Sequence, residues 1–189
     1  MPVLSTVARV KGALRIPAAI TLHDARLSEL IDEAEGDALA EIGADAWVAA
    51  YRTEVPRTTP GRSIVLLDQF PVWAVASATL DSSALVENTD YQWEAGGAFE
   101  LLDGAYFPLT ARKLSVHYKA GPIETAGSTP ADLIRLSTLL AARQFNLEGV
   151  AGLASSSVRP IAKAIAGHDE DAVQAIIDGI MARYRKPAG

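Results

Sequence analysis

The hydrophobic period of this chain changes twice, and these changes constrain its fold more than any other feature. From Thr21 to Tyr51 the apolar residues recur with the spacing of a helix, from Pro56 to Pro122 they alternate with a period of two, and after Pro122 the helical spacing returns. A pattern with one of these periods does not bury its apolar residues in the other structure. The separated segments therefore predict an α+β fold, in which a helical body carries an inserted antiparallel β-rich block.

The breaks between the patterns set the expected domain boundaries. Pro56, Pro60 and Gly61 interrupt the first helical segment, and Gly121 with Pro122 ends the β-rich segment. We expect residues 1–55 to form the N-terminal part of the helical body, residues 56–121 the inserted block, and residues 122–189 the C-terminal part of the body.

Several helices are predicted in the body. One begins at a capping box, Thr21 with Asp24, and ends near Gly43, and a second helical patch over residues 44–51 continues its path. A long helix begins at Thr129 and Pro130, and its wide apolar arc favours burial on more than one side. It is followed by a small-residue loop over 149–157, a short helix over 160–166 and a last helix over 169–186, whose end charges complement the helix dipole.

Short strands joined by polar turns are predicted in the block. In one of them Leu114, Val116 and Tyr118 face inward, and in another Trp73 and Val75 face away from the side chains that alternate with them. The predicted strands cover residues 63–67, 72–80, 84–86, 91–94, 99–102 and 113–120.

Composition excludes several classes of protein. The 189 residues include no cysteine, which excludes a disulfide scaffold, a thiolate metal site and a cysteine nucleophile. The 17 basic and 23 acidic residues give a net charge of −6, which argues against a protein that binds phosphate backbones. No apolar stretch approaches the roughly 18 residues of a membrane span, so we expect a soluble protein made inside the cell.

Residues that could carry catalysis are few and scattered. His23, His117 and His168 form no pair at ligand spacing. The run from His168 to Asp171 is interpreted as an acidic helix start rather than a cation site, and the serines at 155–157 lack the frame of a nucleophile elbow. The sequence thus predicts no enzymatic activity, no cofactor and no metal, and a small hydrolase that uses His168 and the adjacent acids is a less favoured alternative.

Several segments, taken in order, resemble the head–tail connector (adaptor or head-completion) proteins of tailed bacteriophages. They include the helix over residues 27–34 and the last strand of the block, Leu114 to Gly121, which leads into the start of the next helix at Pro130 to Leu133. The complete set is residues 11–16, 27–34, 71–81, 85–91, 97–102, 114–121, 130–133 and 182–187. The resemblance weakens over residues 149–168.

The resemblance implies a structural, non-enzymatic function in the neck of a virion, at the interface of head and tail. Proteins of that family form a ring, usually of twelve subunits, which docks on the portal protein and connects it to a stopper or tail-completion protein. DNA passes through such a ring without specific binding, and a net charge of −6 on each subunit agrees with a channel that does not hold phosphates. A stopper or tail-completion protein is the alternative within the virion.

The resemblance also points to the last helix and its tail as the contact with the portal. The candidates are Ile180, Tyr184, Arg185 and Lys186. Two alternatives remain open at this stage, because Ile180 and Tyr184 could instead pack on the preceding helix and the basic residues could only complement the helix dipole. Trp73 and Trp93 are interpreted as core or inter-subunit packing residues rather than ligand cages.

Overall fold

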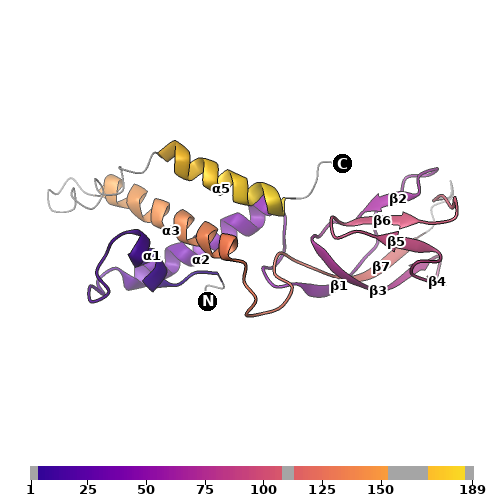
Figure 1. The fold of residues 1–189 in the computed structure, drawn as a ribbon, viewed down its shortest axis with the longest axis horizontal. Helices are drawn as coiled ribbons and strands as arrows, with labels where there is room; N and C mark the ends of the chain where they lie inside the picture. The colour runs from indigo at the N-terminus through magenta and orange to yellow at the C-terminus, as the bar shows by residue number, and fades with distance from the viewer. Residues whose placement is uncertain (1–3, 108–112, 153–169, 186–189) are drawn as a thin grey trace. The chain divides into compact units, whose positions relative to one another are not determined.

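The computed structural model describes residues 4–107, 113–152 and 170–185. The chain forms two compact units: a helical unit of residues 1–42 and 129–183, and a β unit of residues 43–128 and 184–189 (Figure 1). The β unit is thus inserted between helices, and the predicted α+β class is confirmed.

The helical unit contains α1 (Val7–Ala13), α2 (Asp24–Ile42), α3 (Ala131–Gly152) and α5 (Glu170–Tyr184). The core of this unit lies where α1 and α2 pack against α3, and its aliphatic side chains are almost completely removed from water. Burial of each leucine or isoleucine contributes about 1.5–3 kcal/mol, so this shared core holds the helices together. The buried cluster is Val10, Leu14, Ile16, Leu27, Leu30, Ile31, Ala34, Ala141 and Ala142.

Helix α1 has no counterpart among the predicted helices. It is short, and its N-terminus is capped by Thr6, whose hydroxyl accepts a hydrogen bond from the Arg9 amide. Lys11 is buried on this helix, and its Nζ donates to Asp24 Oδ1 at 2.8 Å and to the Ala18 carbonyl at 3.0 Å. Asp24 was expected to cap α2, and the structure instead pairs it with this buried lysine.

A buried carboxylate fastens the segment that precedes α1. Glu35 of α2 accepts hydrogen bonds at Oε1 from the amides of Leu4 at 2.9 Å and Ser5 at 3.1 Å, and from the Ser137 hydroxyl at 3.0 Å. A buried charged group is stable only where hydrogen bonds replace its hydration. Glu35 therefore joins three parts of the helical unit: the N-terminal segment, α2 and α3.

Helix α5 runs antiparallel to α3. Arg143 of α3 donates to Gln174 of α5, and Arg183 near the end of α5 lies 3.5 Å from Asp132 at the start of α3. The apolar face of α5 is buried at Ile177, Ile180 and Met181. This agrees with the predicted helix, although its described bounds are shorter than the predicted 169–186.

The β unit contains two antiparallel sheets. One has the strand order β1-β7-β3-β4 and the other the order β2-β6-β5. Side chains from both sheets, such as Phe99 of one and Tyr118 of the other, belong to one buried cluster, so the sheets enclose a common core. The strands are β1 (Ala50–Glu54), β2 (Ile64–Leu66), β3 (Val72–Leu80), β4 (Ser83–Leu85), β5 (Tyr91–Trp93), β6 (Ala98–Leu101) and β7 (Leu114–Ala120).

Strand β7 follows the predicted alternation and β3 does not. Leu114, Val116 and Tyr118 are fully buried, as predicted. In β3 the register with β7 shifts between Val72 and Ala74 and again between Val75 and Ser77. Each β-bulge adds a residue and moves the following side chains to the other face, so Val75 packs against the same core as Val72 instead of lying on the opposite face.

Two predicted segments are wrong. The helical patch predicted over 44–51 contains no helix, and its last two residues belong to β1, which pairs with β7 from Ala50 opposite Ala120 to Glu54 opposite Val116. The β unit therefore begins at residue 43, earlier than the expected boundary at 56. The loop predicted from residue 149 is also wrong at its start, because α3 continues to Gly152. The predicted helix over 160–166 lies outside the described residues.

Candidate functional site

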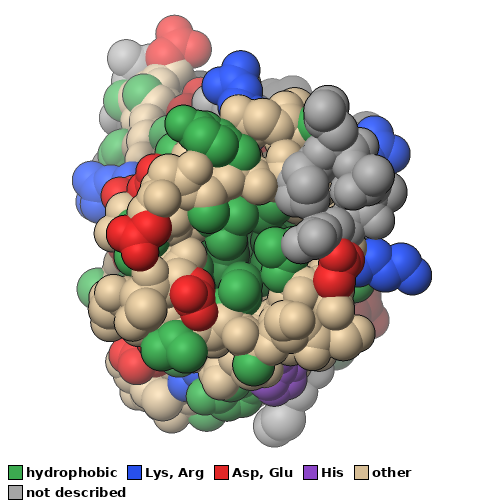
Figure 2. All heavy atoms as spheres, turned by 90° about the vertical axis from the view of Figure 1, so that its right-hand side faces the viewer, with side chains coloured by type: hydrophobic (Ala, Val, Ile, Leu, Met, Phe, Trp, Pro, Cys, Tyr) green, Lys and Arg blue, Asp and Glu red, His purple; other side chains and the backbone are tan. Residues whose placement is uncertain are grey.

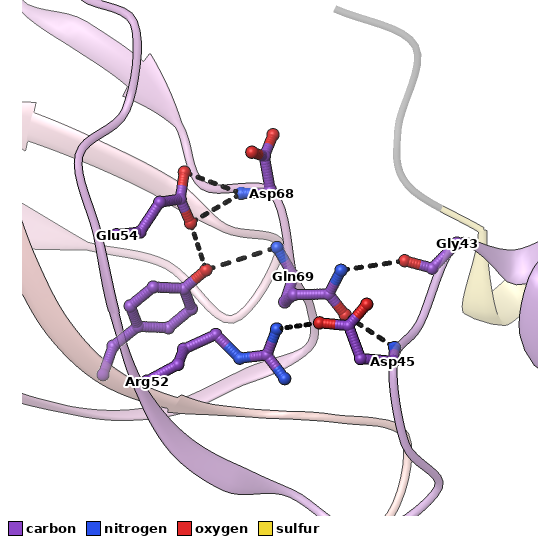
Figure 3. Close-up of polar contacts among 7 residues, drawn as sticks. Gly43, Asp45, Arg52, Glu54, Asp68 and Gln69 are labelled. Atoms are coloured by element: carbon purple, nitrogen blue, oxygen red, sulfur yellow. Dashed lines mark hydrogen bonds and ion pairs between the residues drawn. The ribbon is translucent and has the colours of Figure 1, made fainter.

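A cluster of polar side chains fixes the chain where it leaves α2 and enters the β unit (Figure 3). The Gln69 side chain binds the backbone on both sides of this segment, since its Nε2 donates to the Gly43 carbonyl at 3.0 Å and its Oε1 accepts from the Asp45 amide at 3.2 Å. Arg52 of β1 donates to the Asp45 carboxylate. The side-chain amide of Gln69 thus makes the hydrogen bonds that a neighbouring strand would otherwise make to this irregular segment.

The second half of this cluster is built around Glu54. Its carboxylate accepts hydrogen bonds from the backbone N–H of Asp68, at 3.1 and 3.2 Å, and from the Tyr118 hydroxyl. The backbone N–H of Gln69 in turn donates to the Tyr118 hydroxyl at 3.3 Å. Burial, reinforced by the hydrogen bond to Glu54, raises the pKa of Tyr118 well above its usual range. A tyrosine that keeps its proton always donates this hydrogen bond, so the hydroxyl is not an activated nucleophile. The cluster of Glu54, Tyr118 and Gln69, which we call the clamp, holds β1, β7 and the segment before β3 together.

The chain returns from the β unit along a second segment, which lies beside the first. Ala49 donates to the Ile123 carbonyl at 2.7 Å, Ile123 donates to the Trp47 carbonyl at 2.9 Å, and Val48 with Ile123 forms a parallel bridge. Gly121 has φ +149°, and a Cβ atom there would lie 2.8 Å from the Cα of Ala49. Only glycine permits this approach, so the two crossing segments are held together by their backbones.

The two described histidines are each explained by contacts within one unit. His23 contacts the ring of Phe145 in the helical unit, with the centroids 5.5 Å apart. His117 in the β unit stacks on Tyr51 at 5.4 Å and lies 3.1 Å from the Thr53 hydroxyl. His168 lies outside the described residues. Among residues 4–107, 113–152 and 170–185, no group of three His, Asp or Glu side chains is placed to hold a metal ion.

The two tryptophans singled out in the sequence both lie in the β unit and both have partners for the indole N–H. Trp73 donates to the Gly121 carbonyl at 2.8 Å, and Trp93, packed against the core, donates to Glu87 at 2.8 Å. Trp73 therefore also fastens the returning segment.

The predicted contact residues at the end of α5 differ in exposure. Ile180 is buried, Tyr184 is half-buried and Arg185 is exposed. Lys186 lies outside the described residues. Tyr184 and Arg185 are thus accessible on the surface of the chain, whereas Ile180 is buried among residues of the chain itself.

Figure 2 looks onto the side of the molecule that carries the β unit. Hydrophobic side chains gather in a hollow at the centre of this face, and separate acidic side chains stand around it. The described part of the chain also contains no helix long and apolar enough to cross a membrane. The contacts described above all hold the chain's own segments together.

Neither a protein-family model nor a curated protein matches this chain. Solved structures do. A chain described as "Virion of native gene transfer agent (GTA) particle" aligns with a TM-score of 0.58 and 17% identity, covering 97% of this chain and 90% of that chain. A chain of the "Neck of native GTA particle computed with C12 symmetry" aligns at 0.55 and 16%, covering 97% and 89%.

A chain of the "Neck of empty GTA particle computed with C6 symmetry" aligns at 0.54 and 16%, covering 97% of this chain and 90% of that chain. Identities this low establish the fold alone. The resemblance to connector proteins is confirmed at that level: the chain has the fold, over nearly its whole length, of chains found in the neck of a gene transfer agent particle.

Proposed function

We propose that this protein is a structural component of a virion neck, an adaptor that forms a ring on the portal and connects it to a stopper or tail-completion protein. The observation that carries the proposal is the shared fold, which covers 97% of this chain and 89–90% of the neck chains and so includes both the helical and the β unit. The likeness extends over both units and the connections between them, so the proposal carries over a whole neck chain rather than one shared domain.

The ring is the second element of the proposal. The similar neck structures were computed with C6 and C12 symmetry, which supports a ring of this chain, with twelve copies as the proposed number. A net charge of −6 on each copy leaves the ring strongly negative, so DNA would pass through the central channel without being held.

The end of α5 is the proposed contact with the portal. Tyr184 and Arg185 supply an aromatic ring and a guanidinium, two of the groups most common at the centre of protein interfaces, and Lys186 adds a further cation. Ile180 contributes indirectly in this proposal, since its burial holds α5 on the helical unit.

The proposal is tested by electron microscopy of the purified protein mixed with the portal protein of the same particle. We expect a ring stacked on the portal, and the variant Tyr184→Ala with Arg185→Ala is expected to form fewer complexes. The matched control is Arg62→Ala, which removes an exposed arginine of the β unit. A protein that never binds the portal under any condition contradicts the adaptor function.

A stopper or tail-completion protein is the second candidate, because the neck contains more than one kind of chain and the fold alone does not separate them. Cross-linking in particles distinguishes the two, since contacts with tail proteins and none with the portal favour the stopper. The third candidate, a hydrolase at His168, requires a measured activity that His168→Ala abolishes without unfolding the protein.

A further inference from the structure

The exposed face of α2 is a continuous acidic surface. From Glu29 to Glu41 its solvent side carries five carboxylates and no basic residue, and Glu29, Glu33, Asp37 and Glu41 follow one another at intervals of four residues. Like charges at this spacing repel each other on a helix. Arg26 at the start of the helix compensates part of the charge, with Glu29 at 2.8 Å, Glu33 at 3.1 Å and Glu148 also in contact. Asp37 has no ion pair within the described residues.

The exposed face of α1 has the opposite charge. Ala8, Arg9, Gly12 and Ala13 are all exposed on it, and Arg15 follows at the end of the helix. Lys11, the other basic residue of this region, points into the helical unit and is paired with Asp24. In the described part of the chain neither Arg9 nor Arg15 forms an ion pair. The helical unit therefore has an acidic face on α2 and a basic face on α1.

Each of these two faces also contains a glycine that the chain itself does not require. A Cβ atom added to Gly12 of α1 or to Gly36 of α2 would meet no atom within 4 Å. Both residues lie inside helices, where alanine is the more stable choice. A bare backbone at such a position is explained where another helix approaches closely, because the missing side chain shortens the distance between the helix axes.

From these observations we infer that the acidic face of α2 in one copy packs against the basic face of α1 in the next copy around the ring. The acidic face comprises Glu29, Asp32, Glu33, Gly36, Asp37, Ala40 and Glu41, and the basic face Ala8, Arg9, Gly12, Ala13 and Arg15. This inference rests on the proposed ring, and it identifies the surfaces through which the copies meet. The opposite charges orient and align the contact, and the small residues allow the helices to approach.

The contact joins two different surfaces of the same chain. Such a heterologous contact repeats from copy to copy and closes into a ring when the rotation between neighbours divides the circle evenly. Two acidic faces, or two basic faces, repel each other, so the same charges that favour this contact exclude a symmetric dimer through either face.

The absence of cysteine from the natural sequence allows a direct test. Arg9→Cys and Asp37→Cys are prepared as separate single-cysteine proteins, mixed, and treated with a short bismaleimide, both at high concentration and in rings assembled on the portal. We expect a cross-linked dimer from the mixture and almost none from either protein alone. The control pair, Arg62→Cys with Glu94→Cys on exposed positions of the β unit, is expected to give none.

Charge reversal provides the second measurement. Arg9→Asp or Asp37→Arg alone is expected to weaken self-association at least about tenfold, because each places like charges against each other, and the mixture of the two variants is expected to recover it. Gly36→Ala is expected to weaken self-association while the isolated chain becomes more stable. Gly179→Ala, an equally open glycine of α5, serves as its control and leaves self-association unchanged.

The outcomes separate the inference from the proposed function. If the natural protein forms rings but the Arg9 and Asp37 cysteines do not cross-link, and charge reversal has no effect, the inference is wrong and the adaptor function stands. If the natural protein forms no higher assembly at high concentration or on the portal, both are wrong. A dimer from Asp37→Cys alone would replace the heterologous contact with a symmetric one.

Discussion

The helical and β units use glycine in opposite ways, and the difference separates residues required for folding from residues available for assembly. In the β unit, Gly121 allows two backbones to approach so closely that a Cβ atom would lie 2.8 Å from Ala49. In the helical unit, Gly36 faces open space, where the chain itself has no use for a missing side chain. The contact with Ala49 explains Gly121 within its own chain, whereas Gly36, in open space on a charged helix face, is where we propose that a neighbouring copy packs.

The polar groups of the two units differ in the same way. In the β unit, Glu54, Tyr118 and Gln69 form a clamp that their own unit satisfies. In the helical unit, the buried Glu35 is satisfied, but Arg9, Arg15 and Asp37 on the surface have no ion pair within the described residues. The predictions below test whether this contrast holds.

The largest effect is expected at Gly121. Alanine at this position meets the backbone of Ala49 and must also adopt a φ of +149°, so Gly121→Ala is expected to lower the free energy of unfolding by about 3 kcal/mol. Chemical denaturation followed by circular dichroism measures the change. Gly127→Ala, at a positive φ of +91° but in open space, is the control and should cost about 1 kcal/mol. Equal losses would show that the close approach to Ala49 contributes nothing.

Glu35 is expected to give the next largest effect. Glu35→Ala leaves the amides of Leu4 and Ser5 and the hydroxyl of Ser137 without their acceptor, and the expected loss is about 2 kcal/mol. Glu35→Gln keeps an acceptor oxygen and should lose less. Limited proteolysis provides a local measurement, because release of the N-terminal segment should make residues near Ser5 cleavable first. Unchanged protection in Glu35→Ala would contradict the assigned anchoring role.

Tyr118→Phe is expected to cost about 1.5 kcal/mol at neutral pH, since it removes the hydrogen bond to Glu54 and the acceptor of the Gln69 backbone amide. The pH dependence gives a sharper test. Because burial raises the pKa of Tyr118 above the value of about 10 in the unfolded chain, the folded state binds the proton more tightly. The associated stability is complete below pH of about 10 and is lost as the pH rises through the raised pKa.

The natural protein should therefore lose stability above pH of about 10 more steeply than Tyr118→Phe. Denaturation at a series of alkaline pH values measures the two slopes. The exposed Tyr51 supplies the matched variant, and Tyr51→Phe should follow the natural protein. Parallel curves for the natural protein and Tyr118→Phe would mean that Tyr118 titrates as in the unfolded chain.

The smallest effect on stability is expected in the helical unit. Gly36→Ala should raise the free energy of unfolding of the isolated chain by about 0.7 kcal/mol, because alanine is the better helix former and has open space. Thermal denaturation of dilute protein measures it. A destabilised Gly36→Ala chain would mean that a contact within the chain, and not a neighbouring copy, accounts for the glycine.

Local patterns predicted most of the elements and missed those that depend on distant partners. Strand β7 and helix α2 have long, regular periods, and both were predicted close to their observed bounds. The segment over residues 44–51, which leads into β1, was mistaken for helix because its alanines and aromatic residues fit either pattern, and only the pairing of β1 with β7 decides it. Helix α1 was missed because it spans seven residues and is stabilised by packing on α2 and α3.

The candidate surfaces also differ in whether the sequence indicated them or only the structure revealed them. The end of α5 followed from a resemblance in sequence, and its role as the portal contact stays a prediction. The clamp around Glu54 left no signal in the sequence, because Gly43, Glu54, Gln69 and Tyr118 are separated by up to 75 positions and none belongs to a motif. The faces of α1 and α2 were visible only once burial showed which charges point to solvent.

By itself, the sequence determined the order of helical and strand segments, the absence of thiol chemistry and the acidic balance, because hydrophobic period and composition are properties of neighbouring residues. Tertiary structure alone decided the bulges of β3, the pairing of the two segments that cross between the units, and which charges remain unpaired at the surface. Each of these depends on which distant residues meet in space, and a linear pattern does not contain that information.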